Sequence, residues 1–171
     1  MPVPTQRPTP ASRTIAVTGL ALMLVAGVLV AGCQSDERTA EVERGAIEEL
    51  LAEYLPLLAE AYRTGNVEVL RAVASEKELA AMSKQIGDLM SQEGRVVDPE
   101  LESFTVEQIE VWNYSNAFVT TIEVWDLKVL ASGTETVLSE VDDQRSRVKY
   151  QLKRRDEGWQ ILSRIRETTF E

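Results

Sequence analysis

The period of the hydrophobic pattern changes once along this chain, and that change limits what the chain can fold into. Between about residues 46 and 92, apolar side chains recur every three or four positions, which is the spacing of amphipathic helices. From about Leu101 onward they alternate with polar side chains, and Val, Ile, Thr and aromatic residues become common, as in β-strands. A set of helices followed by long strands favours an α+β fold.

The helical part divides into about three segments. The first begins near residue 43 and ends at Gly65, which supplies a C-terminal cap, and Pro56 is expected to kink it. The stretch "NVEVLRAVA" predicts a second, shorter helix over residues 66–74. "SEKE", which begins at Ser75, fits a capping box that opens a third helix through about residue 92.

Four strands are predicted after the helices. Turn signals at "NYSN", "SG" and "RDEG" separate them, at about residues 102–112, 116–131, 134–154 and 158–169. Asp142 with Asp143 suggests a bulge that bends the third strand. In the fourth strand, Trp159, Ile161, Ser163 and Ile165 are expected to point the same way. We therefore expect the helices to pack on one face of a curved, four-stranded antiparallel sheet.

The first 32 residues have the order of a secretory signal. Arg7 and Arg13 stand in a polar, Pro-rich start, an uncharged apolar run follows from Ile15 to Ala31, and small residues end it. An uncleaved transmembrane anchor is the alternative, because a spanning helix needs roughly 17–25 apolar residues. We predict a signal peptide over residues 1–32, a tether over 33–42 and one domain over 43–171.

The sequence "LVAGC", which ends at Cys33, resembles the lipobox of bacterial lipoproteins. The resemblance implies that the signal peptidase recognises Val30, Ala31 and Gly32, and that the lipid is attached to Cys33. Several acyl chains hold a protein firmly, because each buried methylene contributes about 0.8 kcal/mol. Gln34 follows Cys33, and the resemblance then implies the periplasmic face of the outer membrane in a diderm bacterium. In other bacteria it implies the outer face of the cell membrane.

Charge is divided unevenly about Cys33. All 28 acidic residues lie beyond it, whereas Arg7 and Arg13, from a total of 18 basic residues, lie before it. Nucleic-acid binding needs clustered Lys and Arg that neutralise phosphates, so the acidic body argues against that function. This balance favours solubility and cationic partners.

Two longer stretches resemble the nuclear-transport-factor-2-like superfamily, whose fold is a cone of three helices against a bent antiparallel sheet. "LLAEAYRTGNVEVLRAVAS" joins a long helix through Gly-Asn to a short one, and "VKYQLKRRDEGWQILSRI" joins two strands through a tight charged turn. The second stretch is also similar to the intermembrane-space domain found in plastid division proteins. The resemblance covers about residues 40–170. Family members include binding scaffolds and small-molecule isomerases or dehydratases, which place Asp, His or Tyr deep in the cone.

Aromatic side chains are the candidates for the wall of such a pocket, namely Tyr54, Tyr62, Trp125 and Tyr150. The chain has no histidine, so proton transfer would need a carboxylate or a tyrosine, and Asp126 with Tyr150 is the candidate pair. The simpler interpretation is that aromatic residues at this spacing belong to the core and that Asp126 is an exposed acid. We therefore expect no catalytic residue.

Basic residues alternate along the third strand, at Arg145, Arg147, Lys149 and Lys153, which we call the basic stripe. The basic stripe would suit anionic headgroups, cell-wall polymer or an acidic partner. The alternative is a solvent face paired with Glu residues of the neighbouring strand. Calcium-loop, zinc and phosphate-loop motifs are missing from the sequence, and we expect neither a metal nor a cofactor.

These observations predict an extracytoplasmic lipoprotein, anchored through Cys33, whose domain is a non-catalytic binding module for an envelope protein or a small apolar ligand. The alternatives are a lipid-tethered isomerase or lyase that uses a pocket carboxylate, and a structural envelope protein with an exposed apolar patch. An enzyme should show an open, partly apolar pocket with a buried acid. An interaction module should fill its cone with its own side chains.

Overall fold

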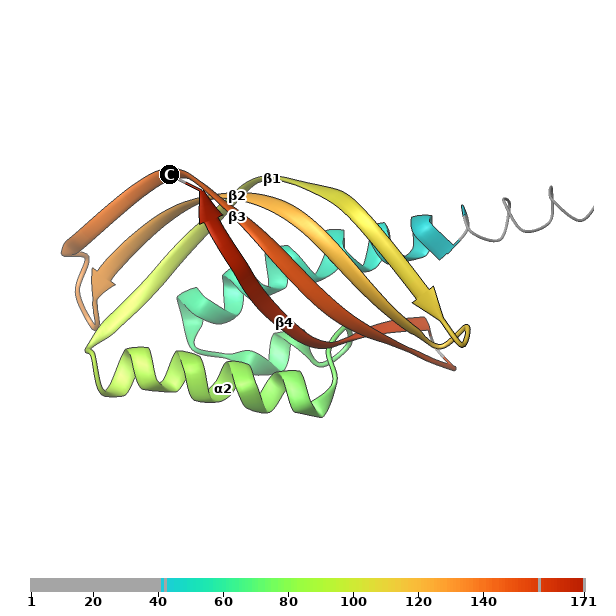
Figure 1. Ribbon diagram of the computed structural model, residues 1–171. Coiled ribbons are helices and arrows are strands. Elements are labelled where there is room, and N and C mark those ends of the chain that lie inside the picture. The colour runs from blue at the N-terminus through green and yellow to red at the C-terminus, as the bar shows by residue number, and fades with distance from the viewer. Residues whose placement is uncertain (1–40, 42, 157, 171) are drawn as a thin grey trace, which may run out of the picture. The chain divides into compact units, whose positions relative to one another are not determined.

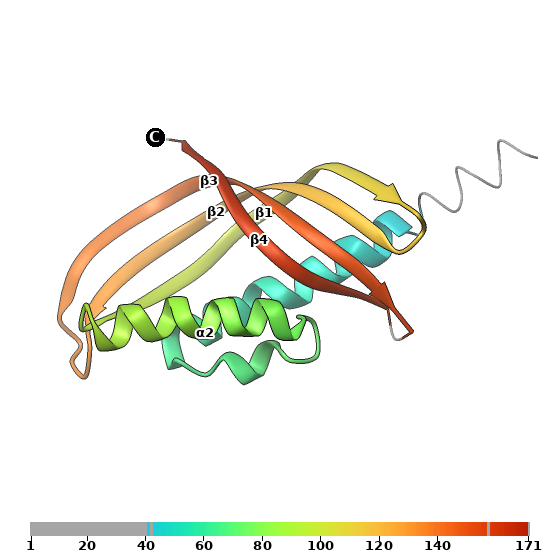
Figure 2. The same cartoon turned by 60° about the horizontal axis from the view of Figure 1, so that its bottom comes forward.

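A computed structural model describes residues 41, 43–156 and 158–170, and the fold is that of the unit Glu43–Glu171. Its helices precede a four-stranded antiparallel sheet with the strand order β1-β2-β3-β4. The sheet is bent, and the helices lie against its concave side (Figure 1). In the second view, α2 runs below the strands from one end of the sheet toward the other (Figure 2). The predicted α+β class is confirmed.

The strands are long and follow one another through hairpins. They are β1 (Arg95–Trp112), β2 (Asn116–Ala131), β3 (Val137–Arg155) and β4 (Gly158–Phe170). Asn113 and Tyr114 have φ values of 53° and 54° in the β1–β2 turn, which are values required in a tight hairpin turn. β1 starts earlier than the alternation predicts and includes Pro99. An edge strand tolerates proline, and β1 pairs with β2 alone.

The first helix covers residues 43–64 and continues through Pro56. Gly65 ends it with a φ of 76°, and the Gly65 N–H donates to the carbonyl of Ala61 at 2.9 Å. This is the predicted glycine cap, where a residue without a Cβ takes the left-handed conformation. Glu43 fixes the other end of the helix, because its carboxylate accepts from Trp159 Nε1 at 2.8 Å and pairs with Arg154.

The expectation of three helices is wrong: the described residues form two α-helices and a single 3₁₀ turn, η1 (Val67–Leu70). The physical reason lies in the backbone after η1. Ser75 N–H donates to Ile161 O at 2.8 Å, and Ile161 N–H donates to Val73 O at 2.9 Å. These groups therefore pair with β4 in place of continuing a helix.

The capping box at Ser75 is half formed. Ser75 Oγ accepts from Glu78 N–H at 3.3 Å and opens α2 (Glu76–Ser91) as predicted. In a complete box the Glu78 carboxylate would return to the backbone of Ser75. In this protein it accepts instead from the hydroxyl of Tyr54 at 2.9 Å, inside the cone. The third residue of α2, Glu78, thus places a buried carboxyl group in the interior.

The predicted bulge in β3 is confirmed. Trp125 pairs with Gln144 and Leu127 with Val141, so Asp126 faces Asp142 and Asp143 together. Asp143 has a φ of 52°, and its N–H donates to Asp126 Oδ1 at 2.7 Å. A bulge of this kind bends a strand and increases its twist, and β3 turns over the helices in this region (Figure 1).

A second bulge, in β4, overturns the expected alternation of that strand. Ile161 pairs with Leu152 and Ser163 with Gln151, which leaves Leu162 as an extra residue. The phase of the strand reverses beyond it. Trp159 and Ile161 are buried as expected, but Ile165 is 64% exposed. Arg164 takes the inward position instead, opposite the buried Tyr150.

Candidate functional site

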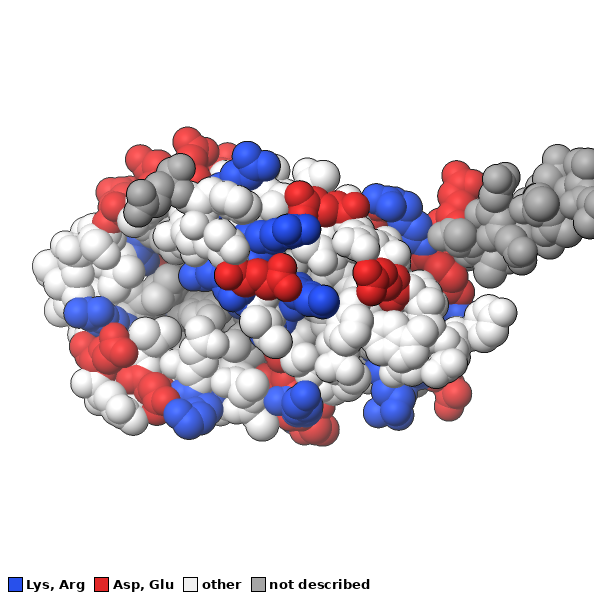
Figure 3. Space-filling view, in the orientation of Figure 1, with Lys and Arg blue, Asp and Glu red and all other residues white. Residues whose placement is uncertain are grey.

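A cavity of about 210 Å³ lies between the concave face of the sheet and the two helices. The surface is hollowed between the sheet and α2 in the space-filling view (Figure 3). Its lining comes from the helix over residues 43–64, α2, β1, β2 and β4. The lining residues are Leu58, Tyr62, Gln85, Leu89, Val97, Pro99, Trp125, Leu127, Val129, Arg164 and Arg166. Most of this wall is apolar, and the two arginines stand together on β4.

Arg164 reaches the cavity because of the β4 bulge. Its Nε atom is buried and has no hydrogen-bond partner, and the side chain forms no ion pair with any described residue. Burial lowers the pKa of Arg164, but the neighbouring Tyr150 and Tyr54 raise it, and the net pKa lies above its usual value. The guanidinium is therefore charged in an apolar setting, where an unpaired charge is costly.

Glu123 acts electrostatically on this arginine, and its carboxylate already accepts hydrogen bonds from three other side chains. Oε1 accepts from Tyr150 Oη at 2.5 Å and from Thr121 Oγ1 at 2.9 Å, and Oε2 accepts from Trp125 Nε1 at 2.9 Å. Glu123 is 0% exposed. Burial first, and the Glu123 carboxylate second, raise the pKa of Tyr150, so the phenol remains a donor. This network positions the wall of the cavity and holds Trp125 in place.

A second cavity of about 250 Å³ adjoins the first and shares Tyr62, Gln85, Arg164 and Arg166 with it. Its wall includes Glu78, whose pKa burial raises above the usual carboxyl value, while Tyr54 and Arg164 act in the opposite direction. Gln85 Nε2 donates to Tyr62 Oη at 2.7 Å at the boundary that the two cavities share. The arginine pair thus faces a mainly apolar space on one side and a buried acid on the other.

The structure separates the four aromatic residues predicted to line a pocket. Tyr62 and Trp125 line the cavity. Tyr54 and Tyr150 are fully buried and meet edge to face, with ring centroids 6.0 Å apart. Asp126, the acid of the alternative catalytic pair, does not line this cavity. It lies in a separate polar hollow with Asp98 and Asp142 among others, and holds the β3 bulge.

Arg164 and Arg166 are the residues that sequence reasoning missed. In the sequence they are polar residues that alternate with other positions of the strand, which is typical of side chains on the solvent-facing side of a sheet. The extra residue in β4 exchanges the two faces. A run in which both alternating sets contain apolar residues was the available signal for a bulge at this position.

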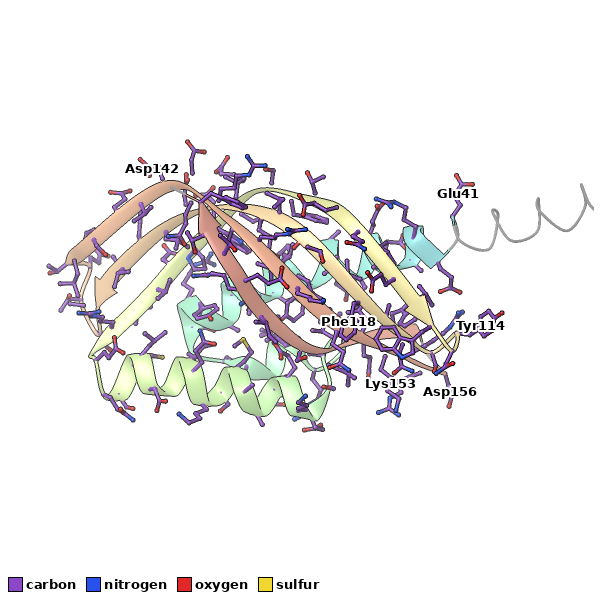
Figure 4. The ribbon with its side chains drawn as sticks, viewed as in Figure 1. Glu41, Tyr114, Phe118, Asp142, Lys153 and Asp156 are labelled. Carbon is purple, nitrogen blue, oxygen red and sulfur yellow. The ribbon has the colours of Figure 1, made fainter. Side chains whose placement is uncertain are left out.

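The basic stripe lies on the outer face of β3. Arg147 Nε is 3.0 Å from Glu107 of β1, and Arg145 and Lys149 lie over the rings of Phe170 and Phe118. Lys153 lies near Tyr114 at the end of the sheet that holds the β1–β2 turn, and Asp142 lies at the bend of β3, far from Lys153 (Figure 4). Basic and acidic side chains are interleaved over this face (Figure 3). The stripe is thus partly paired with acids, and its role as a docking surface remains a prediction.

Three predictions concern residues that the structure leaves undescribed: the signal peptide, the recognition positions Val30, Ala31 and Gly32, and lipidation of Cys33. They lie outside the described residues and stay predictions. Within residues 43–156 and 158–170, no helix has the length and apolar character needed to cross a membrane. Among the same residues, no group of three acids or cysteines is arranged to hold a metal ion.

Comparison with solved structures places the fold. The intermembrane-space region of the chloroplast protein ARC6 matches with a TM-score of 0.60 and 16% identity, over 70% of this chain and 92% of that chain. This chain shares the ARC6 region's fold. A periplasmic fragment of TraM matches with a TM-score of 0.50 and 14% identity, over 72% and 96%. The expected similarity to an intermembrane-space domain is confirmed for the fold.

An NTF2-like protein with a cystatin-like fold from Novosphingobium aromaticivorans also matches, with a TM-score of 0.46 and 20% identity over 80% of this chain and 87% of that chain. No protein-family model and no curated protein sequence matches the chain. At these identities the likeness shows the fold and carries no activity.

Proposed function

We propose that this protein is an extracytoplasmic lipoprotein, anchored through Cys33, whose cone-shaped unit binds a small molecule without transforming it. The observation that carries the binding role is the apolar cavity with a charged, unpaired Arg164 in its wall. A protein gains nothing in stability from such an arrangement, since a buried charge without a partner is expensive. A mainly apolar cavity with a few polar groups in its wall is typical of a ligand site.

The anchoring role rests on the order of the first 33 residues. A basic start, an apolar run and the sequence "LVAGC" together resemble the signal and lipobox of bacterial lipoproteins. The ARC6 region and the TraM fragment are described as an intermembrane-space region and a periplasmic fragment. Both descriptions name a compartment on the far side of a membrane from the cytoplasm or stroma, and the location proposed for this chain is of the same type.

A lipid-tethered isomerase or lyase is the second candidate, and Glu78 is the observation that favours it. The cavities are open and partly apolar, and Glu78 is a buried acid whose pKa burial raises. A general acid or base needs such a shifted pKa and contact with the substrate space. The general acid or base would then be Glu78 and not Asp126, the acid predicted from the sequence.

Native mass spectrometry of the protein, extracted gently from its own membranes, tests both parts of the proposal. We expect the mass of an acylated chain that begins at Cys33, with a small molecule retained by a fraction of the protein. A full-length, lipid-free mass would refute the anchor. An acylated chain that never retains a small molecule would refute the binding role. A retained molecule that the protein converts over time, in a manner abolished by Glu78→Gln, would instead establish the enzyme.

A further inference from the structure

The two arginines in the cavity wall lack an ion-pair partner among the described residues. Arg164 forms no ion pair or side-chain hydrogen bond within the described part of the chain, and the same holds for the exposed Arg166. Two buried carboxylates act on Arg164 without forming an ion pair with it. Glu123 already accepts from Tyr150, Thr121 and Trp125, and Glu78 accepts from Tyr54. An anion from outside the chain would supply the direct ion pair that Arg164 lacks. A guanidinium offers a planar fork of donors that matches a carboxylate in a bidentate pair.

The rest of the cavity wall suits an aliphatic chain. Apolar side chains from four elements form it, namely Leu58, Leu89, Val97, Pro99, Leu127 and Val129. These residues leave apolar surface uncovered inside a folded unit, and burial of a hydrocarbon chain there is favourable in proportion to the area covered.

The volume and the neighbouring charges restrict the ligand further. At about 210 Å³ the cavity is smaller than the roughly 300–1,000 Å³ typical of sites for drug-sized ligands, which favours a single acyl chain of medium length. Glu78 and Glu123 lie near Arg164 and act on its surroundings. A head group with a single negative charge is therefore favoured over a doubly charged phosphate monoester.

We propose that the cavity binds a single-chain amphiphile with a carboxylate head, a medium-chain fatty acid or a close analogue. The carboxylate accepts hydrogen bonds from Arg164, with Arg166 adding charge at the mouth, and the chain lies along Leu58, Leu89 and Leu127. This inference rests on the proposed ligand-binding function and names the class of ligand.

The test uses native mass spectrometry of the full chain released from micelles of a non-ionic detergent. Decanoate, decanol and decyl phosphate are added separately, so that the chain is constant and only the head group changes. We expect one bound decanoate per protein, with an affinity about tenfold or more above that of decanol, as a charge-assisted bidentate contact would give. Equal binding of decanoate and decanol would overturn the assignment, and so would tighter binding of decyl phosphate.

Variants locate the head group. Arg164→Gln should lose the preference for decanoate over decanol, and Arg164→Lys should retain part of it, because the charge remains while the fork is lost. Arg155→Gln is the matched control, since Arg155 is exposed near the β3–β4 turn and lines none of these cavities. Retention of the full preference by Arg164→Gln would contradict the proposal. The comparison of the three head groups on the wild-type chain decides the question even where a variant fails to fold.

The outcome also separates the two proposals. If decanoate does not bind but the protein extracted from its membranes retains another small molecule, the carboxylate assignment fails and the ligand-binding function stands. If the extracted protein retains nothing and none of the three probes binds, both fail.

Discussion

Glu123 shows how a buried charge in this unit is stabilised by donors from its own and the neighbouring strand. Replacing it by alanine would leave the Tyr150 hydroxyl and Trp125 Nε1 without their acceptor, and the Thr121 hydroxyl with only the Val148 carbonyl at 3.4 Å. We expect Glu123→Ala to lower the free energy of unfolding by about 3–5 kcal/mol, measured by urea denaturation. Glu123→Gln keeps Oε1 as an acceptor and should cost about 1–3 kcal/mol. A loss below about 1 kcal/mol for Glu123→Ala would show that the network contributes little to stability.

Glu78 should make stability depend on pH. Burial raises its pKa in the folded protein above the value in the unfolded chain, so the folded state binds more protons between the two values. The contribution of Glu78 is therefore most favourable at low pH and is lost as the pH rises through the raised pKa. Glu78→Gln retains an acceptor for Tyr54 and removes the charge.

We expect Glu78→Gln to raise the thermal midpoint relative to wild type at neutral pH, with the difference shrinking as the pH falls through the carboxyl range. Thermal unfolding of both proteins from neutral to acidic pH measures this. Lys84→Gln provides a control, because Lys84 and its partner Asp88 lie on the exposed face of α2. A wild-type midpoint that equals or exceeds that of Glu78→Gln at neutral pH would contradict the expectation.

At the scale of elements, Asp126 links one strand to the bend of the next. Its Oδ1 accepts from the N–H of Asp143, a residue with a φ of 52° at the bulge. Asp126→Ala should lower the free energy of unfolding by about 0.5–1.5 kcal/mol in urea denaturation, and leave the binding of small molecules in the cavity unchanged. Asp126→Asn, which keeps Oδ1, should lose less stability. Loss of ligand binding or turnover in Asp126→Ala without loss of stability would restore its catalytic interpretation.

Features that depend on a few neighbouring residues could be predicted from the sequence. Features that depend on the pairing register between two strands could not. Gly65 and Ser75 marked helix ends because caps depend on a few neighbouring residues. The two aspartates of β3 marked a bulge for a similar reason. The only sign of the bulge at Leu162 is that apolar residues occupy both alternating sets of β4. That sign does not fix the position of the bulge, and pairing with β3 decides which set faces inward. The two arginines of the cavity were missed for that reason.

The hydrogen-bond partners of buried side chains also could not be predicted from the sequence. The sequence predicts Tyr54 and Tyr150 at a pocket, because the family it resembles places Tyr deep in the cone. Their hydroxyls instead reach Glu78 and Glu123 within the core. Both acids occupy positions that a solvent-exposed glutamate would fill equally well in sequence, one in a capping box and one in an alternating strand. The pairing depends on how the helices dock on the sheet.

At the scale of the whole molecule, the proposed function requires that a binding unit with a large acidic excess remain at a membrane. All 28 acidic residues lie beyond Cys33, and an acidic body is repelled by anionic lipid. Retention must then come from the lipid chains, each methylene of which contributes about 0.8 kcal/mol. The tether between Cys33 and the unit would place the cavity within reach of single-chain amphiphiles that leave the bilayer.

Cys33→Ala should accordingly abolish both cleavage and anchoring by acyl chains, because the thiol that receives the lipid is gone. We expect the variant to accumulate as an uncleaved precursor, seen as a full-length mass in membrane extracts, while wild type gives an acylated chain that begins at Cys33. Ser35→Ala, which keeps the thiol, should be processed as wild type. Cleavage of Cys33→Ala at the same position would end the lipoprotein interpretation, and the cavity would then belong to a protein held, or released, by other means.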